Sequence, residues 1–111
     1  MIVPCEKMIL AVLSGDDVES LVYDLNEHGL YATMLSSTGG FLKKRSVTLM
    51  IGLEEKRLEE ALEILKKHAG ARLETAYLSP NGAVGMAAVP VKVYNGGITA
   101  FVMNVDRCVK Y

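Results

Sequence analysis

The chain has 111 residues, the length of one ordinary domain and enough to bury a hydrophobic core without disulfides or metals. Its formal net charge of −1 argues against a general attraction to nucleic acid or to anionic lipid, so an anionic ligand must be held by a local group of residues. Apolar residues come in short runs separated by charges, whereas a membrane-spanning helix needs about 20 in succession.

Residues 1–13 lack the basic-then-apolar pattern and the cleavage site of a signal peptide. We therefore expect a cytoplasmic protein that forms a single domain over residues 1–111, with no membrane partner. Cys5 and Cys108 lack the paired spacing of a zinc site, and in the cytosol they are expected to be two buried or idle thiols.

Residues 8–13 form a continuous apolar run of strand length, typical of a central strand buried on both faces. Ser14 then offers a helix N-cap, and apolar residues at helical spacing predict a helix that ends at Gly29. Two further strands are predicted over residues 31–35 and 46–51, joined by a polar connection that contains glycine. We expect these two strands to form an antiparallel pair.

The clearest element is a second helix, which two glutamates open and which closes before Gly70. Residues 72–78 alternate their faces as a strand does, and the turn residues that follow predict a loop. Residues 90–105 then predict a hairpin that turns at Asn95-Gly-Gly, because an Asn-Gly turn tolerates positive φ.

The resulting order β-α-β-β-α-β, with an extra C-terminal β-hairpin, predicts an α+β protein of the ferredoxin-like, or split βαβ, class. Two helices would cover one face of its sheet. The strands over residues 8–13 and 46–51 are apolar on both alternations, and Phe101 and Met103 add apolar positions. We therefore expect oligomerisation to cover the other face.

Residues 33–45 gather the parts of a nucleotide site: hydroxyls, the pair Gly39-Gly40, the ring of Phe41 and three consecutive cations that begin at Lys43. Glycines let backbone N–H groups approach phosphate oxygens, an aromatic ring offers an apolar face to a base, and cations hold the charge. The same residues also suit a plain connection, in which the glycines turn the chain, the ring enters the core and the cations lie in solvent. Composition leaves both interpretations open.

Catalytic candidates are few. His28 and His68 precede helix-ending glycines, where imidazole complements the helix dipole. Asp16 and Asp17 open a helix, where acids are ordinary caps, and no third metal ligand is near in sequence. These acids also argue against an acylphosphatase-like hydrolase, because they would repel a substrate phosphate. We therefore do not expect an enzyme.

RNA-binding sheets of this topology display aromatic residues on their first and third strands, and both of these strands lack aromatic residues here. We therefore do not expect a nucleic-acid-binding protein.

Several motifs occur together along nearly the whole chain: Ala32-Thr33, Thr38-Gly-Gly-Phe-Leu42, Gly52, Gly96-Gly97-Ile-Thr-Ala-Phe-Val-Met103 and Val105-Asp106. Their combination resembles the PII-like cyclic-di-AMP receptor family, related in shape to the nitrogen-regulatory PII proteins. The resemblance implies a non-enzymatic, trimeric signal-transduction protein of ferredoxin-like protomers, without a cofactor. Cyclic-di-AMP or a related adenine nucleotide would bind in clefts between subunits, and loops that change conformation would be read by a downstream protein.

The resemblance also implies ligand-binding residues, which are Tyr31, Ala32, Thr33, Gly39, Gly40, Phe41, Leu42, Lys43, Ser46 and Gly52. Thr33 would donate a hydrogen bond, Phe41 would contact a base and Lys43 would assist with phosphate. Tyr31 stands where the family carries an arginine and Ser46 where it carries an asparagine, so phosphate binding would depend on residues 43–45. The alternative is a PII-like trimer similar to the divalent-cation-tolerance proteins, which would bind a metal or a protein partner and no nucleotide.

Overall fold

A computed structural model describes residues 2–38, 46–78 and 88–111 of the chain. Within them lie two α-helices, α1 (Val18–Glu27) and α2 (Leu58–Ala69), each preceded by a short 3-10 turn. The strands are β1 (Ile2–Val3), β2 (Lys7–Ser14), β3 (Ala32–Thr38), β4 (Ser46–Leu53), β5 (Arg72–Leu78), β6 (Val89–Asn95), β7 (Ile98–Asn104) and β8 (Cys108–Val109). The predicted α+β class is therefore confirmed.

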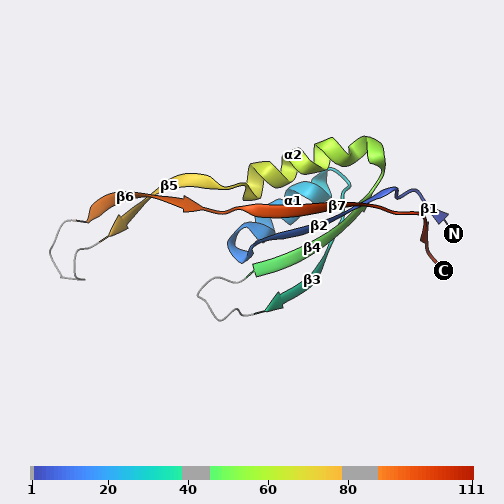
Figure 1. Cartoon of the computed structure of the whole chain (residues 1–111), viewed down its shortest axis with the longest axis horizontal. Coiled ribbons are helices and arrows are strands. Elements are labelled where there is room, and N and C mark those ends of the chain that lie inside the picture. Colours follow the sequence, from blue (N-terminus) through green and yellow to red (C-terminus); the bar gives the residue numbers. More distant parts are fainter. Residues whose placement is uncertain (1, 39–45, 79–87) are drawn as a thin grey trace.

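The central sheet has four antiparallel strands in the order β3-β4-β2-β7 (Figure 1). The predicted antiparallel pair of β3 and β4 is confirmed, with Thr33 opposite Met50. Met50 in turn lies opposite Leu10, and Leu10 opposite Phe101, so that one row of residues crosses all four strands. Along the chain the sheet and its helices follow the order β2-α1-β3-β4-α2-β7, which matches the predicted pattern β-α-β-β-α-β. The last strand of that pattern is β7, however, and not residues 72–78 as predicted, because those residues pair with β6 outside the central sheet.

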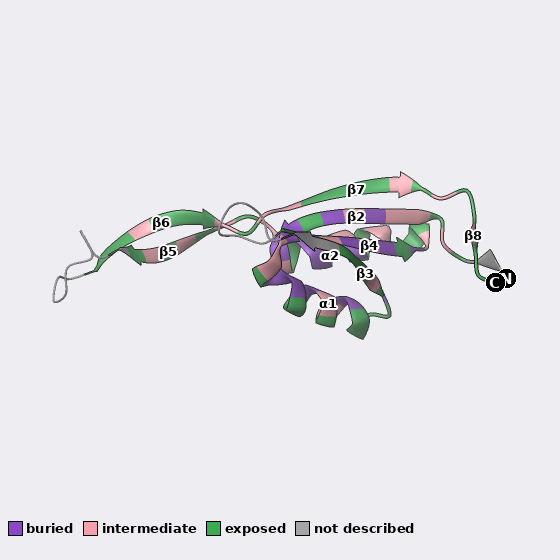
Figure 2. Ribbon diagram, turned by 90° about the horizontal axis from the view of Figure 1, so that it is seen from below, coloured by how far each residue is buried: buried purple, intermediate pink, exposed green. Residues whose placement is uncertain are grey.

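Both helices lie on the same side of this sheet (Figure 2). On that side, alternate residues of β2 and β4 are buried against the helices, because successive side chains of a strand point to opposite faces. The resulting core contains Ile9, Ala11, Leu13, Val47, Leu49, Ile51 and Leu53 from the sheet and Leu21, Leu25, Ala61, Ile64 and Leu65 from the helices. On the other side, β2 is half-buried or exposed within one chain, so burial on both faces would need a partner.

The first helix begins and ends where the sequence predicts. The Ser14 hydroxyl accepts a hydrogen bond from the Asp16 backbone N–H at 3.3 Å, which caps the 3-10 turn ahead of α1. At the other end, Gly29 has a φ of 72°, a left-handed conformation that favours glycine. The next backbone N–H, of Leu30, donates to the Leu25 carbonyl at 2.8 Å and closes the helix.

The extra C-terminal hairpin over residues 90–105 was predicted wrongly. In the structure β6 pairs with β5 in a separate two-stranded sheet, while β7 pairs with β2 at the edge of the central sheet. Gly96 and Gly97 have φ values of 77° and 112°, and they pass the chain from one sheet to the other instead of reversing it. The Gly97 backbone N–H donates to the Ala69 carbonyl at 2.8 Å and holds this junction against the end of α2. The β5-β6 hairpin is thus inserted before the last sheet strand and reaches away from the body (Figure 1).

A charged cluster anchors the base of this hairpin. Arg72 donates to Asp17 Oδ1 from Nη2 at 2.9 Å and to the carboxylate of Glu74 from Nε. These hydrogen bonds, with that to Asp17 first, raise the pKa of Arg72 above its ordinary value. Asp17 occupies the N-cap position of α1, as predicted, but it is only 7% exposed and its side chain makes no cap hydrogen bond to the helix. Its carboxylate instead ties the hairpin to the body.

Candidate functional site

The candidate site begins at β3, the outer strand of the central sheet. Thr33 is exposed there and lies in register with Met50, on the face of the sheet that the helices leave open. Ala32 pairs with Ile51 and packs against the core on the opposite face, so only its backbone is available to a ligand on the side of Thr33. Tyr31, directly before the strand, is exposed.

Two further predicted residues lie on the open face of β4. Ser46 and Gly52 are both exposed and belong to the alternation of β4 that points away from the core. A Cβ atom added to Gly52 would lie 2.9 Å from Cys5 Sγ, so a larger residue here would require that sulfur to shift. Contact with Cys5 is not predictable from sequence spacing, because the N-terminal segment reaches β4 only through tertiary folding.

The strand register sets the size of a ligand that could use these residues together. Thr33 is opposite Met50, which is four residues along β4 from Ser46. At about 3.3 Å per residue, Thr33 and Ser46 are roughly 13 Å apart. One ligand can touch both only if it is extended, or if two of its groups bind separately.

The remaining predicted ligand residues, Gly39, Gly40, Phe41, Leu42 and Lys43, lie outside the described residues. The residues that flank this segment are a cross-strand pair, Thr38 with Ser46, at the end of β3 and β4. The segment is therefore attached to the same sheet edge that carries Thr33.

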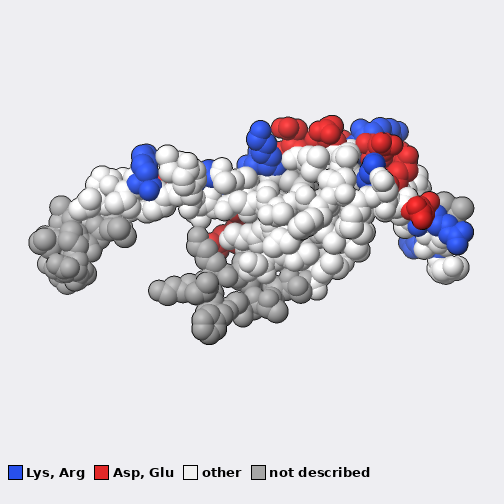
Figure 3. Space-filling view, viewed as in Figure 1, with Lys and Arg blue, Asp and Glu red and all other residues white. Residues whose placement is uncertain are grey.

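The open face of the sheet is apolar. Phe101 is 56% exposed and Val12 is 37% exposed, and the half-buried Met8, Leu10, Met50 and Met103 lie on the same alternation of their strands. Figure 3 shows charged side chains concentrated along α2 and near the chain ends, with a wide uncharged surface over the sheet. Clustered exposure of large apolar side chains is typical of a protein–protein interface.

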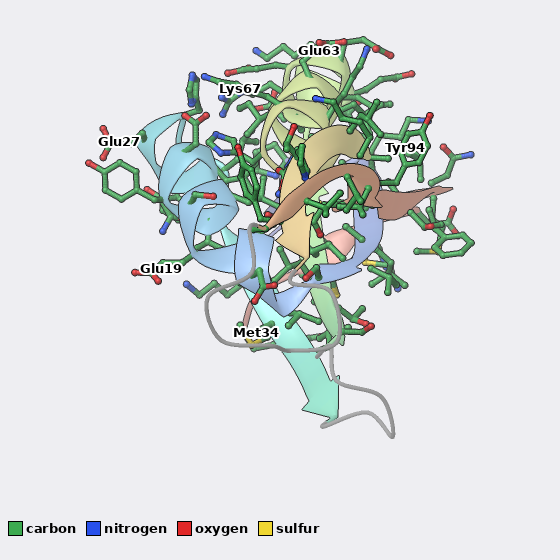
Figure 4. The ribbon with its side chains drawn as sticks, turned by 90° about the vertical axis from the view of Figure 1, so that its left-hand side faces the viewer. Glu19, Glu27, Met34, Glu63, Lys67 and Tyr94 are labelled. Carbon is green, nitrogen blue, oxygen red and sulfur yellow. The ribbon has the colours of Figure 1, made fainter. Side chains whose placement is uncertain are left out.

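An open groove of about 630 Å³ lies on the other side of the molecule, between the two helices. Figure 4, which views the molecule along its long axis, shows charged residues of this helical side such as Glu27 and Glu63. The groove contains Asp24, whose Oδ2 accepts a hydrogen bond from His68 Nε2 at 2.7 Å. His28 Nδ1 lies 2.8 Å from the Asp24 carbonyl oxygen, as a helix-ending imidazole should, whereas His68 bonds across to the neighbouring helix.

This groove has the character of an ion-paired helix contact. Within residues 2–38, 46–78 and 88–111, no group of three His, Cys, Asp or Glu side chains is arranged to hold a metal ion. Nor is any helix in these ranges long and apolar enough to cross a membrane. The bond between Asp24 and His68 joins α1 to α2, which gives Asp24 a structural role.

Asp24 makes the stability of the protein sensitive to acid. The hydrogen bond from His68, followed by the charges of His28 and His68, holds the pKa of Asp24 below its ordinary value. A carboxylate with a depressed folded-state pKa stabilises the fold above its unfolded pKa, and this contribution is lost as the pH falls through the folded pKa. We expect the free energy of unfolding to fall more steeply below about pH 4 in the wild type than in Asp24→Asn.

Urea denaturation at a series of acidic pH values measures this difference. Glu27→Gln is the matched control, because it removes an exposed carboxylate from the same helix. Its pH profile should follow that of the wild type. Parallel profiles for the wild type and Asp24→Asn would show that the ion pair does not contribute to stability.

Comparison with known proteins identifies relatives of this arrangement. A family model described as "Cyclic-di-AMP receptor" matches residues 6–111. Among solved structures, a crystal structure of a functionally unknown protein from Pediococcus pentosaceus superimposes with a TM-score of 0.76 at 35% sequence identity. The match covers 98% of this chain and 100% of that chain. The similarity therefore includes the sheet, both helices and the inserted hairpin.

Proposed function

Because this chain belongs to the cyclic-di-AMP receptor family, whose members are non-enzymatic signal-transduction proteins, we propose that it senses cyclic-di-AMP at the β3 edge of the sheet. The observation that carries this placement is that Thr33, Ser46 and Gly52 are all exposed on one open face. These are residues that the resemblance implicates, and they come from adjacent strands.

The proposed site combines side chains and backbone. Thr33 donates a hydrogen bond from its hydroxyl, and Ser46 offers a second hydroxyl roughly 13 Å away along the sheet. Gly52 and the backbone at Ala32 border the same region, with Tyr31 at its end. The segment that holds Gly39, Gly40, Phe41, Leu42 and Lys43 supplies backbone donors, an aromatic ring and a positive charge. The separation of the two hydroxyls suits a ligand with two bases better than a mononucleotide.

The apolar open face supports a homotrimer, the assembly that the resemblance implies. Phe101 lies in the row that also contains Leu10, Met50 and Thr33, so a subunit packed on Phe101 would approach the ligand residues as well. Covering this face removes large apolar side chains from water, which favours association. Ligand bound near Thr33 would then contact two subunits.

In the proposed pathway the protein acts in the cytoplasm, where it carries the signal from a cyclic dinucleotide to a downstream protein. Ligand binding at Thr33 and Ser46 would act on the segment that connects β3 to β4, because that segment is attached to the strand ends beside the site. The downstream protein would bind the segment in its changed conformation and would thus recognise the ligand indirectly.

Calorimetric titration with cyclic-di-AMP, beside ATP, AMP and cyclic-di-GMP, tests the site. We expect selective binding of cyclic-di-AMP by the wild type and an affinity loss of roughly ten-fold or more in Thr33→Val, which removes the hydroxyl but keeps the shape. Thr75→Val is the matched control, because Thr75 is an exposed strand threonine on the hairpin. It should bind like the wild type.

Two results would contradict the proposal. Unchanged affinity in a folded, trimeric Thr33→Val variant would move the site away from β3. Absence of heat with every nucleotide would favour the alternative, a trimer of the same scaffold that binds a metal or a protein.

A double variant that combines Thr33→Val with Phe41→Ala tests the segment between β3 and β4. It should bind cyclic-di-AMP more weakly than Thr33→Val alone.

A further inference from the structure

The two ends of the chain meet at the end of the molecule opposite the β5-β6 hairpin (Figure 1). There β1 and β8 form a small antiparallel sheet, in which Val3 lies opposite Cys108. Beyond β1, the Glu6 carbonyl accepts a hydrogen bond from the Val105 backbone N–H at 3.0 Å, so the two segments stay paired past Cys5. The Glu6 backbone N–H donates to the Leu53 carbonyl at 3.0 Å and fixes the pair to β4.

This pairing brings together the only two cysteines of the chain. Cys5 and Cys108 are both half-buried and both free. Burial raises the pKa of the Cys5 thiol, and the Cys108 thiol adds to this rise as a charged and hydrogen-bonding neighbour. Two thiols from near opposite ends of the chain are therefore neighbours in the fold, although their spacing in sequence predicts idle residues.

We propose that Cys5 and Cys108 form a reversible intramolecular disulfide that fastens the C-terminal strand to the N-terminal segment. The oxidant is a peroxide. One thiol loses its proton, and the thiolate attacks a peroxide oxygen and becomes a sulfenic acid as the O–O bond breaks. The departing hydroxide takes up that proton and leaves as the first water. The second thiol displaces the hydroxyl group, which departs as a second water when the S–S bond forms. Overall, two thiols and one hydrogen peroxide give one disulfide and two waters.

The local structure allows the sulfurs to approach each other. A disulfide needs the two sulfurs at about 2.05 Å, closer than hydrogen-bonded thiols, so one or both segments must shift. Cys5 precedes Glu6, which is fixed to β4 and to Val105, so the shift falls mainly on β8, the strand of Cys108. β8 has two residues and pairs only with the two-residue β1 in the described structure. The core residues of the central sheet need not move, which keeps the closure compatible with the fold.

The pair also borders the open face of the sheet. Cys5 Sγ covers Gly52, where an added Cβ would lie 2.9 Å from the sulfur. The proposed disulfide with Cys108 would hold the Cys5 sulfur in one position and would therefore hold the sulfur atom that lies next to Gly52. The disulfide itself rests on the positions of the two thiols and does not depend on the proposed ligand, so the two proposals succeed or fail separately.

Treatment of the reduced full-length chain with hydrogen peroxide tests the disulfide. We expect an intact mass lower by two hydrogen atoms, loss of both free thiols, no covalent dimer on a non-reducing gel, and a linked Cys5–Cys108 peptide after digestion. Dithiothreitol should restore the thiols. Because the bond closes a loop of almost the whole chain, the oxidised form should melt at least about 5 °C higher.

Single and double variants make the result specific. Cys5→Ser and Cys108→Ser each retain one thiol and should show no loss of two hydrogen atoms, and the double variant should keep its melting temperature after peroxide treatment. The proposal is overturned if both thiols stay free under peroxide exposure that oxidises them in the urea-unfolded chain. It is also overturned if the product is a disulfide between two chains or a sulfinic acid.

Discussion

Phe101→Glu is expected to convert the proposed trimer into monomers. The substitution places a carboxylate on the apolar face of the sheet, where Leu10 is the cross-strand neighbour of Phe101. A charge buried in an interface without a partner costs about 3–5 kcal/mol, and one copy would be introduced per subunit. Light scattering coupled to size-exclusion chromatography should therefore give the mass of one 12.1 kDa chain in place of the trimer.

Tyr23→Glu is the matched control for this experiment. Tyr23 is 69% exposed on α1, on the helical side of the molecule, and the change likewise replaces an exposed aromatic ring with a carboxylate. This variant should remain a trimer. If Phe101→Glu also remains a trimer, the subunits associate through another surface, and the exposed apolar residues of the hairpin, Leu73, Tyr77 and Tyr94, become the next to change.

Leu49→Ala is expected to lower the free energy of unfolding by about 3 kcal/mol. Leu49 is 1% exposed and lies in β4, with its side chain on the side of the sheet that the helices cover. Truncation removes apolar contacts and leaves a cavity that the close-packed core fills only in part. Urea denaturation in the monomeric Phe101→Glu background measures this loss without a contribution from subunit association.

Leu35→Ala serves as its control. Leu35 is 49% exposed on β3, at the irregularity in the register between Met34 and Ser36. The same chemical change should cost less than about 1 kcal/mol there, because the side chain is already largely in water. Equal losses at the two positions would mean that β4 does not hold the centre of the core.

Both helices and the β3-β4 pair were predictable because their signals are local. A cap at Ser14, a helix-ending Gly29 and apolar residues at helical or alternate spacing act within a few residues of each other. The junction at Gly96 and Gly97 was not predictable in this way. An Asn-Gly turn between two apolar runs favours a hairpin, but β7 gains more by pairing with β2 along its whole length, and β6 pairs with β5.

For the candidate site, the sequence indicated which residues to consider but not which face they share. Thr33, Ser46 and Gly52 lie on the open face because the strand register places them there, whereas Ala32 points to the core. The residues from Gly39 to Lys43 lie outside the described structure, so their roles stay predictions. The resemblance to the cyclic-di-AMP receptor family is confirmed by the match over residues 6–111.

Local chemistry in the chain was therefore enough to determine the α+β class, the positions of the helices and the apolar character of the second sheet face, while the family was indicated by the resemblance of its motifs. Contacts between distant segments depended on tertiary structure: Arg72 with Asp17, His68 with Asp24, and Cys5 with Cys108. Each of these groups also has an ordinary local role, as a cap, a helix-ending imidazole or an idle thiol. Their actual partners follow from strand pairing and helix packing, because those interactions set which distant side chains lie within a few ångströms of one another.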